Sequence, residues 1–170
     1  GKLEFKVLGD ALGDLILDAL ALLILLAQVD LVLNGFFKLS QTRIGKAPGK
    51  IVVDGEIWPP DEIGVLKAPV ELMINQGKIQ DVKGPGEAAV YKRWLESFND
   101  PNLYYLAHIA YGFNPGVSKL SGRIVLDERV FGAITFGFGT SNRRHAVTHS
   151  DCVVLYPTVF LDGIEIERNG

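Results

Sequence analysis

The stretch THSDCVVLYPTVFLDGIEIERNG, residues 148–170, decides the class of fold. Cys152–Leu161 and Ile164–Glu167 are rich in β-branched and aromatic residues, and a strong Asp-Gly turn signal separates them, so we expect a final β-hairpin. His149 and Asp151 stand at the start of its first strand. Side chains two residues apart on extended backbone point to the same side. This pair is therefore expected to share one face of a sheet.

Two more strands are expected immediately upstream. Leu103–Phe113 is extended and apolar, and Ala133–Phe138 reads as a strand. The glycines at 137 and 139 would let another backbone or a ligand come close to it. Leu126–Val130, between the two, is expected to form a short helical turn. We expect these late strands to build one sheet.

The middle of the chain predicts a hairpin and a helix. Val70–Ile74 and Lys78–Val82 flank the turn Asn75–Gly77, where a three-residue turn with a bulge fits the phase of the apolar residues. The segment GPGEAAVYKRWLESFNDPN, residues 84–102, has one apolar stripe at helical spacing, and its NDP ends the helix. The stripe consists of Ala88, Tyr91, Trp94, Leu95 and Phe98.

Shorter signals complete the predicted fold. KIVVDG, residues 50–55, is a short strand ending in a turn, and WPPDE, residues 58–62, is a loop because consecutive prolines remove backbone donors. The pattern as a whole predicts an α+β (mixed α/β) fold with a mixed, largely antiparallel sheet. The helix Glu87–Phe98 is expected to pack on this sheet, and the Val70–Val82 hairpin to lie at its periphery.

The composition narrows the classes of partner. Of 170 residues, 48% are apolar and 22% charged, which allows a buried core. The net charge of −3, without a Lys/Arg stripe, argues against nucleic acid. The single cysteine, Cys152, excludes an internal disulfide, favours the cytoplasm and is expected to be a buried small hydrophobe. A mean hydropathy of +0.21 and several edge strands favour a homo-oligomer.

The most lipophilic segment is Leu12–Leu33. Its longest unbroken apolar run, Ala19–Ala27, has nine residues, whereas a membrane-spanning helix needs about 20. A signal peptide is not indicated either, because a basic start and a cleavage site are not convincing. We expect a buried helix that leads into a strand at Asp30–Leu33, with an edge strand at Leu3–Leu8 before it.

All three histidines, His108, His145 and His149, lie in the second half of the chain. His149 and Asp151, joined by a second histidine from another strand, would form the two-histidine, one-carboxylate ligand set of an open iron or zinc site. The apolar neighbours of His108 predict that it points away from the face they line. The alternative stays open, because H-x-D occurs by chance and a histidine in an apolar strand is usually a hydrogen-bonded core residue.

The polar loop GTSNRRHAVTHSD, residues 139–151, supplies the other candidate groups. Arg143 and Arg144 could bind a substrate carboxylate through paired hydrogen bonds, with solvated loop charges as the alternative. His145 and Ser141 are candidates for proton transfer. The glycines around this loop lack the P-loop lysine and the Rossmann spacing, so a nucleotide site is not expected.

Three blocks in order resemble a known family: DPNLYYLAHIAYGFNPG (100–116), ERVFGAITFGFGTSN (128–142) and the stretch at 148–170. They resemble the C-terminal region of the aminopeptidase T (M29 metallopeptidase) superfamily, and most closely the branch containing 2,5-dihydroxypyridine 5,6-dioxygenase. The resemblance predicts an aminopeptidase-T-like C-terminal domain at 49–170, after an N-terminal helix/strand segment at 1–48. It also implies a homo-oligomer.

The resemblance implies a set of metal ligands. The matching positions are His108, His149 and Asp151. In the dioxygenase branch a serine of the middle block joins the metal shell. Its nearest match here is Gly139, with Thr140 or Ser141 as substitutes. In the peptidase branch two glutamates bind a paired metal centre. Glu87 corresponds to one, and no glutamate in Ser40–Gly49 corresponds to the other.

Three functions follow as hypotheses. The first is an Fe(II) dioxygenase that opens a hydroxylated, pyridine-type ring. The second is an M29-like aminopeptidase, in which zinc or cobalt activates water and Glu87 acts as ligand or base. The third is a non-catalytic scaffold or binding protein. A divalent metal is expected, Fe(II) first and Zn or Co as alternatives, with a small-molecule or short-peptide substrate and no membrane or nucleic-acid partner.

Overall fold

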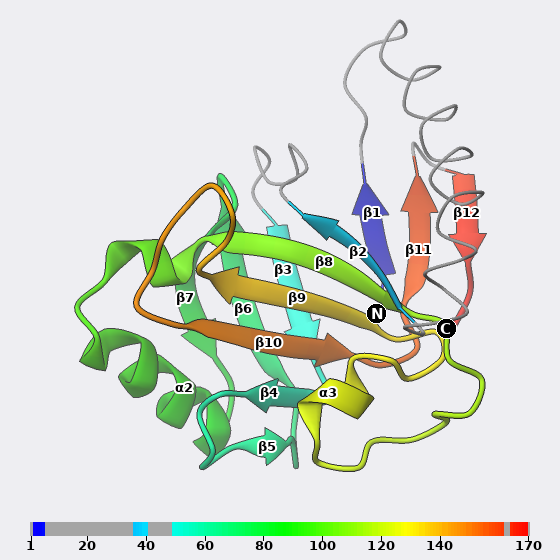
Figure 1. The fold of residues 1–170 in the computed structure, drawn as a ribbon, viewed down its shortest axis with the longest axis horizontal. Helices are drawn as coiled ribbons and strands as arrows, with labels where there is room; N and C mark the ends of the chain where they lie inside the picture. Colours follow the sequence, from blue (N-terminus) through cyan, green and yellow to red (C-terminus); the bar gives the residue numbers. More distant parts are fainter. Residues whose placement is uncertain (1, 6–35, 41–48, 162–163, 170) are drawn as a thin grey trace, which may run out of the picture.

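A six-stranded antiparallel sheet forms the centre of the fold (Figure 1). The computed structural model describes residues 2–5, 36–40, 49–161 and 164–169. The long strands of this sheet come from the second half of the chain. The predicted α+β class with a largely antiparallel sheet is confirmed. In sheet order the strands are β2 (Phe36–Ser40), β8 (Leu106–Gly112), β9 (Ile134–Gly139), β10 (His149–Val154), β4 (Glu56–Trp58) and β5 (Gly64–Val65).

A second antiparallel sheet packs on the apolar face of the first. It consists of β3 (Gly49–Val53), β6 (Val70–Asn75) and β7 (Lys78–Lys83). The predicted hairpin is therefore confirmed, and a register shift between Met73 and Ile74 confirms its bulge. Val70 and Leu72 are fully buried, because alternate residues of a strand point to one face. The hairpin thus contributes to the main core as well as lying beside the central sheet.

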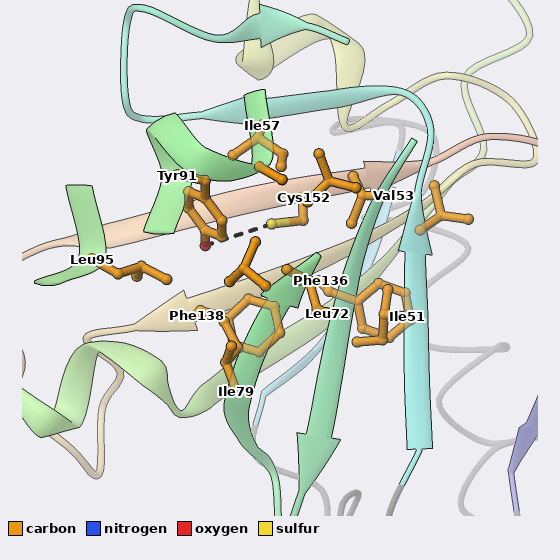
Figure 2. Close-up of a cluster of buried hydrophobic side chains, with 14 of the residues drawn as sticks. Ile51, Val53, Ile57, Leu72, Ile79, Tyr91, Leu95, Phe136, Phe138 and Cys152 are labelled. Carbon is orange, nitrogen blue, oxygen red and sulfur yellow. Dashed lines mark hydrogen bonds between the residues drawn. The ribbon is translucent and has the colours of Figure 1, made fainter. Parts of the chain in front are cut away.

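The predicted amphipathic helix is α2, Gly86–Ser97. Ala88, Tyr91 and Leu95 of its apolar stripe are buried in the same core as both sheets, where each buried large side chain stabilises the fold by about 1.5–3 kcal/mol. Figure 2 shows Tyr91 and Leu95 of α2 in one cluster with residues of the sheets, including Leu72, Phe138 and Cys152. Cys152 is fully buried, as predicted, and its thiol donates to Tyr91 Oη at 3.8 Å. Burial raises the pKa of this thiol to about 12.

The predicted single strand Cys152–Leu161 is wrong. β10 ends at Val154, and the chain then enters a different sheet. Tyr156 has a φ of 46°, and Pro157 has no N–H to offer a ladder, so the strand cannot continue. The third sheet consists of β1 (Lys2–Phe5), which is parallel to β11 (Thr158–Leu161), and β12 (Ile164–Glu167). The antiparallel pairing of β11 with β12 confirms the final hairpin, whose turn lies outside the described residues.

Two short helices differ slightly from prediction. Residues 103 and 104, expected to be extended, belong to the 3₁₀ helix η1 (Pro101–Tyr104). Pro at the first helical position and the Asp100 carboxylate, which accepts from the Asn102 N–H, favour this turn. The predicted turn at Leu126–Val130 is α3 (Ile124–Asp127), which starts two residues earlier.

The predictions for the N-terminal region are only partly covered by the structure. β1 confirms part of the edge strand expected at Leu3–Leu8. The predicted helix within Leu12–Leu33 and the strand at Asp30–Leu33 lie outside the described residues. The domain division after residue 48 stays a prediction. Within the described ranges, no helix is long and apolar enough to cross a membrane.

Candidate metal centre

Four residues on adjacent strands form a row across the central sheet. His108 of β8 pairs with Gly137 of β9, Gly137 pairs with Asp151 of β10, and Asp151 pairs with Trp58 of β4. Residues paired in this way direct their side chains to the same face. We call these four residues the site row. Cys152, the neighbour of Asp151, points into the core, so the site row lies on the opposite face of the sheet. His108 therefore points away from the apolar core face, as predicted.

The two imidazoles converge on the carboxylate of Asp151. Nε2 of His149 lies 3.1 Å, and Nε2 of His108 lies 3.3 Å, from the same Asp151 Oδ1. The rings are stacked, with centroids 5.0 Å apart and planes 8° apart. The three ligand atoms all lie within 4.8 Å of one another. Ligands bound to one ion at about 2.0–2.2 Å are roughly 3–3.5 Å apart, which is the spacing of Asp151 Oδ1 from each Nε2.

Gly137 provides the space in which the rings meet. A Cβ added at this residue would lie 2.1 Å from His108 Cε1 and 2.6 Å from His149 Nε2. Both distances are far below van der Waals contact, which is about 3.5–4.0 Å between carbon atoms. The two imidazoles therefore occupy the volume that any side chain at residue 137 would need.

The Thr140 carbonyl fixes the tautomer of His149. Nδ1 of His149 lies 3.1 Å from the Thr140 carbonyl oxygen. A carbonyl can only accept a hydrogen bond, so Nδ1 carries a proton, and Nε2 is the nitrogen that faces Asp151. An imidazole held in this way by a backbone carbonyl is the usual state of a metal-binding histidine.

Burial and charge suit Asp151 to the role of the anionic ligand. The exposed fraction of the side chain rises from 4% for His108 to 16% for Asp151 and 25% for His149. The cluster therefore opens to solvent on the His149 side. Burial alone would raise the pKa of Asp151, but hydrogen bonds from His108 and His149 hold it below its ordinary value. Asp151 is thus a carboxylate at neutral pH, as a metal ligand must be.

The loop between β9 and β10 carries four other candidate residues, namely Ser141, Arg143, Arg144 and His145. The guanidinium carbon of Arg144 lies 3.7 Å from the Tyr105 ring centroid. The Arg144 N–H donates to Ser141 Oγ at 3.2 Å, and the Ser141 N–H donates to the Arg144 carbonyl at 2.7 Å. These bonds close the loop on itself. Arg143 and His145 are exposed.

Helix η1 fastens this loop from its far side. Asp100 Oδ2 accepts from the Val147 N–H at 2.8 Å, and Asn102 Nδ2 donates to the His145 carbonyl at 3.0 Å. The backbone of the loop is therefore held beside the open end of the cluster, while the side chain of His145 faces solvent.

The remaining sequence candidates lie elsewhere. Gly139 pairs with His149 at the edge of the cluster, and Thr140 contributes its carbonyl. The register puts Gly137, rather than either of these, at the centre of the site row. Glu87 lies in the first turn of α2 on the core side of the central sheet, so the structure does not bring it to the cluster.

A buried acid pair beside the site row has no clear signal in the sequence. Glu56 of β4 and Asp127 of α3 are both fully buried. The Asp127 carboxylate accepts from the Ser121 N–H and hydroxyl and from the Gly122 N–H, at 2.7–3.0 Å. Among the described residues, none donates to either carboxyl oxygen of Glu56. Glu56 therefore fits as a protonated acid that donates to Asp127, which stays ionised.

Glu56→Gln is expected to stabilise the protein above neutral pH. Burial, and then the adjacent Asp127, raise the pKa of Glu56 from 4.5 to about 8. Unfolding therefore releases a proton between these pH values, and wild-type stability falls as pH rises through this window. Glutamine mimics the neutral acid, so at pH 8.5 the variant should be more stable by about 2 kcal/mol, with the difference vanishing near pH 5.

Denaturant unfolding of both proteins from pH 5 to pH 9 measures this difference. The matched control is Glu62→Gln, because Glu62 is exposed and close in sequence. Equal pH dependence in wild type and Glu56→Gln would show that Glu56 is ionised in the folded protein at neutral pH.

The fold and the cluster define a class of protein. Two imidazoles and one carboxylate converge on the same face of an antiparallel sheet in an α+β fold, which is the donor set of a two-histidine, one-carboxylate metal centre. The chain belongs to the 2,5-dihydroxypyridine 5,6-dioxygenase (NicX) family, which it matches over residues 28–170.

Two comparisons with proteins of Pseudomonas putida KT2440 agree with this family. The chain is 27% identical over 129 residues to a 2,5-dihydroxypyridine 5,6-dioxygenase, covering 68% of the chain and 37% of the relative. It shares the fold of the solved 2,5-dihydroxypyridine dioxygenase, with a TM-score of 0.68 and 23% identity, over 80% of this chain and 42% of that one. The chain thus spans less than half the length of these relatives. The predicted dioxygenase branch is confirmed, whereas the wider link to aminopeptidase T stays a prediction.

Proposed function

We propose that this chain carries the metal centre of a dioxygenase that opens a hydroxylated, pyridine-type ring. His108, His149 and Asp151 are the proposed ligands. The observation that carries the proposal is the convergence of their three ligand atoms above Gly137, in a chain of the 2,5-dihydroxypyridine 5,6-dioxygenase family. Fe(II) is the proposed metal, because this donor set is typical of non-haem iron oxygenases. Zinc and cobalt are the alternatives.

Each ligand residue has its own task. The Thr140 carbonyl keeps the proton of His149 on Nδ1, so Nε2 remains available as a ligand. Asp151 supplies the single negative charge, which leaves a bound dication with net positive charge and favours a deprotonated ring hydroxyl. His108 closes the centre on its buried side, so the ring enters beside His149. Bound Fe(II) would supply the redox chemistry, because it can hold a ring hydroxyl and dioxygen together.

The β9–β10 loop is proposed to serve the substrate. His145 and Ser141 would move protons to and from the ring, and Arg143 and Arg144 would bind a substrate carboxylate. The position of the loop, fastened at the open end of the cluster, supports these roles. Arg143 is the better-placed arginine, because it is exposed while Arg144 stacks on Tyr105. The cytoplasmic location and the homo-oligomer stay predictions from the sequence.

Reconstitution under argon tests the proposed function. The protein is loaded with Fe(II), Zn(II) or Co(II), its metal content is measured, and oxygen uptake is then followed with 2,5-dihydroxypyridine. We expect about one metal per chain and oxygen uptake with the iron-loaded protein. His149→Ala should take up no metal.

Other outcomes would point to the other hypotheses. Failure of wild type to bind any of the three metals, with an unchanged melting temperature, would contradict both enzyme functions and favour a scaffold. Release of an N-terminal amino acid from a short peptide by the zinc- or cobalt-loaded protein would favour the aminopeptidase.

A further inference from the structure

Trp58 occupies the end of the site row and is open to solvent. It pairs directly with Asp151 across the β4–β10 ladder, and the Cβ atoms of residues paired in this way are about 4.5–5.5 Å apart. The side chain of Trp58 therefore leaves the backbone beside Asp151, the proposed carboxylate ligand, on the same face of the sheet. Its exposed fraction is 41%, whereas Glu56 and Ile57 before it are fully buried.

The indole and the backbone around it are held in place. Trp58 Nε1 donates to Asp61 Oδ1 at 2.6 Å. Directly after Trp58, the Pro59 carbonyl accepts from the Ser150 hydroxyl at 2.8 Å, which ties this turn to β10. A large apolar surface is thus fixed next to a polar cluster before any ligand arrives, so little side-chain freedom is lost on binding.

Among the residues whose burial the structure describes, the other exposed aromatic side chains do not share this position. Phe98 follows α2 on the core side of the central sheet, and Tyr156 lies after the end of β10. Trp58 is the exposed aromatic residue that the strand register places in the site row. An exposed indole offers a flat surface that stacks on another aromatic ring with centroids about 4.5–7 Å apart.

We propose that Trp58 is the stacking platform for the planar aromatic ring of the substrate, which it holds over the site row beside Asp151. The inference rests on the proposed function and deepens it, because it assigns a residue that selects flat, hydroxylated aromatic rings. In this role Trp58 contacts the face of the substrate ring, while the metal held by the three ligands would bind the ring hydroxyl. Its loss should weaken ring binding and leave metal binding intact.

The test uses zinc-loaded protein under argon, so that the ring binds without turnover. The dissociation constants of Zn(II) and of 2,5-dihydroxypyridine are measured by calorimetry for wild type, Trp58→Ala, Trp58→Phe and Trp94→Phe. Trp94, the other of the two tryptophans, stacks on Tyr91 in α2 and is the matched control. In Trp94→Phe, the remaining fluorescence reports on Trp58 alone.

Trp58→Ala should bind the ring about tenfold more weakly, and Trp58→Phe within about threefold of wild type. Trp94→Phe should bind it normally, and the ring should quench the fluorescence of that variant. All variants should bind zinc like wild type. Ring binding by Trp58→Ala at wild-type affinity, with zinc bound, would overturn the platform and leave the proposed function standing. A wild-type protein that binds no metal would overturn both.

Discussion

Gly137→Ala is expected to fold but to lose metal binding. The added methyl group would collide with both imidazoles, since its ideal position is 2.1 Å from His108 Cε1 and 2.6 Å from His149 Nε2. His108 is buried, and Thr140 holds His149, so neither ring can move aside and still point at Asp151. Even changes outside the ligand set typically cost 10–100-fold in metal affinity. We therefore expect a loss of at least about 100-fold here.

Competition with a zinc chelator measures this loss, and denaturant unfolding without metal measures stability. Overpacking typically costs 1–3 kcal/mol, so the apo variant should remain folded. Gly49→Ala is the matched control, because no atom lies within 4 Å of a Cβ added there. Wild-type zinc affinity in Gly137→Ala would contradict the convergence of the two rings above this glycine.

The secondary structure was largely predictable because its signals are local. The hairpin formed by β6 and β7 follows from alternating apolar residues around a turn, and α2 follows from one stripe at helical spacing. The run from Cys152 to Leu161 shows where local signals stop. Its residues favour a strand throughout, but the left-handed conformation of Tyr156 and the missing N–H of Pro157 divide it between two sheets.

The candidate site was predictable in part for the same reason. His149 and Asp151 are two residues apart on one strand, so their common face follows from strand geometry alone. His108 belongs to another strand, and its place opposite Gly137 depends on a register shift after Leu106 that no residue pattern marks. The resemblance to a family supplied His108 as a ligand, and the structure supplied the register.

The residues that the sequence did not reveal depend on pairing between distant segments. Glu56 meets Asp127 because α3 packs beside β4, and a lone acidic residue in a strand gives no sign of such a partner. Trp58, in a loop-forming WPPDE, looked like part of a turn. Its pairing with Asp151 places it in the site row instead. These positions follow from strand order, which local propensity does not determine.

Asp151→Asn is expected to abolish metal uptake while keeping the fold. Asparagine has almost the same shape, so the pairing of β10 with β9 and β4 can persist. It carries no charge, however, and both histidine Nε2 atoms lose the carboxylate oxygen on which they converge. Removing a ligand should cost more than the 10–100-fold typical of outer residues. Metal at about 100 times the wild-type Kd stabilises wild type by about 2.7 kcal/mol, and this gain should vanish.

Asp151→Asn should also lower the stability of the metal-free protein. The pKa of Asp151 lies below its ordinary value, so its carboxylate stabilises the folded state above pH 3.8, and this contribution is lost as pH falls through the lowered pKa. Losing hydrogen bonds to a charged group should therefore cost the apo variant about 1–3 kcal/mol at pH 7. Asp81→Asn, at an exposed carboxylate bonded to Lys92, is the control that should keep the metal response.

The two measurements on Asp151→Asn separate an active centre from an inherited polar cluster. A scaffold that uses the cluster to tie β8 to β10 across β9 would lose stability on substitution, and its wild type would show no metal response. A metal centre would lose the metal response as well, because the same carboxylate oxygen faces both imidazoles. Gly137 favours the metal centre over the scaffold. A polar cluster that serves stability alone does not require a glycine whose side-chain volume is filled by two histidine rings.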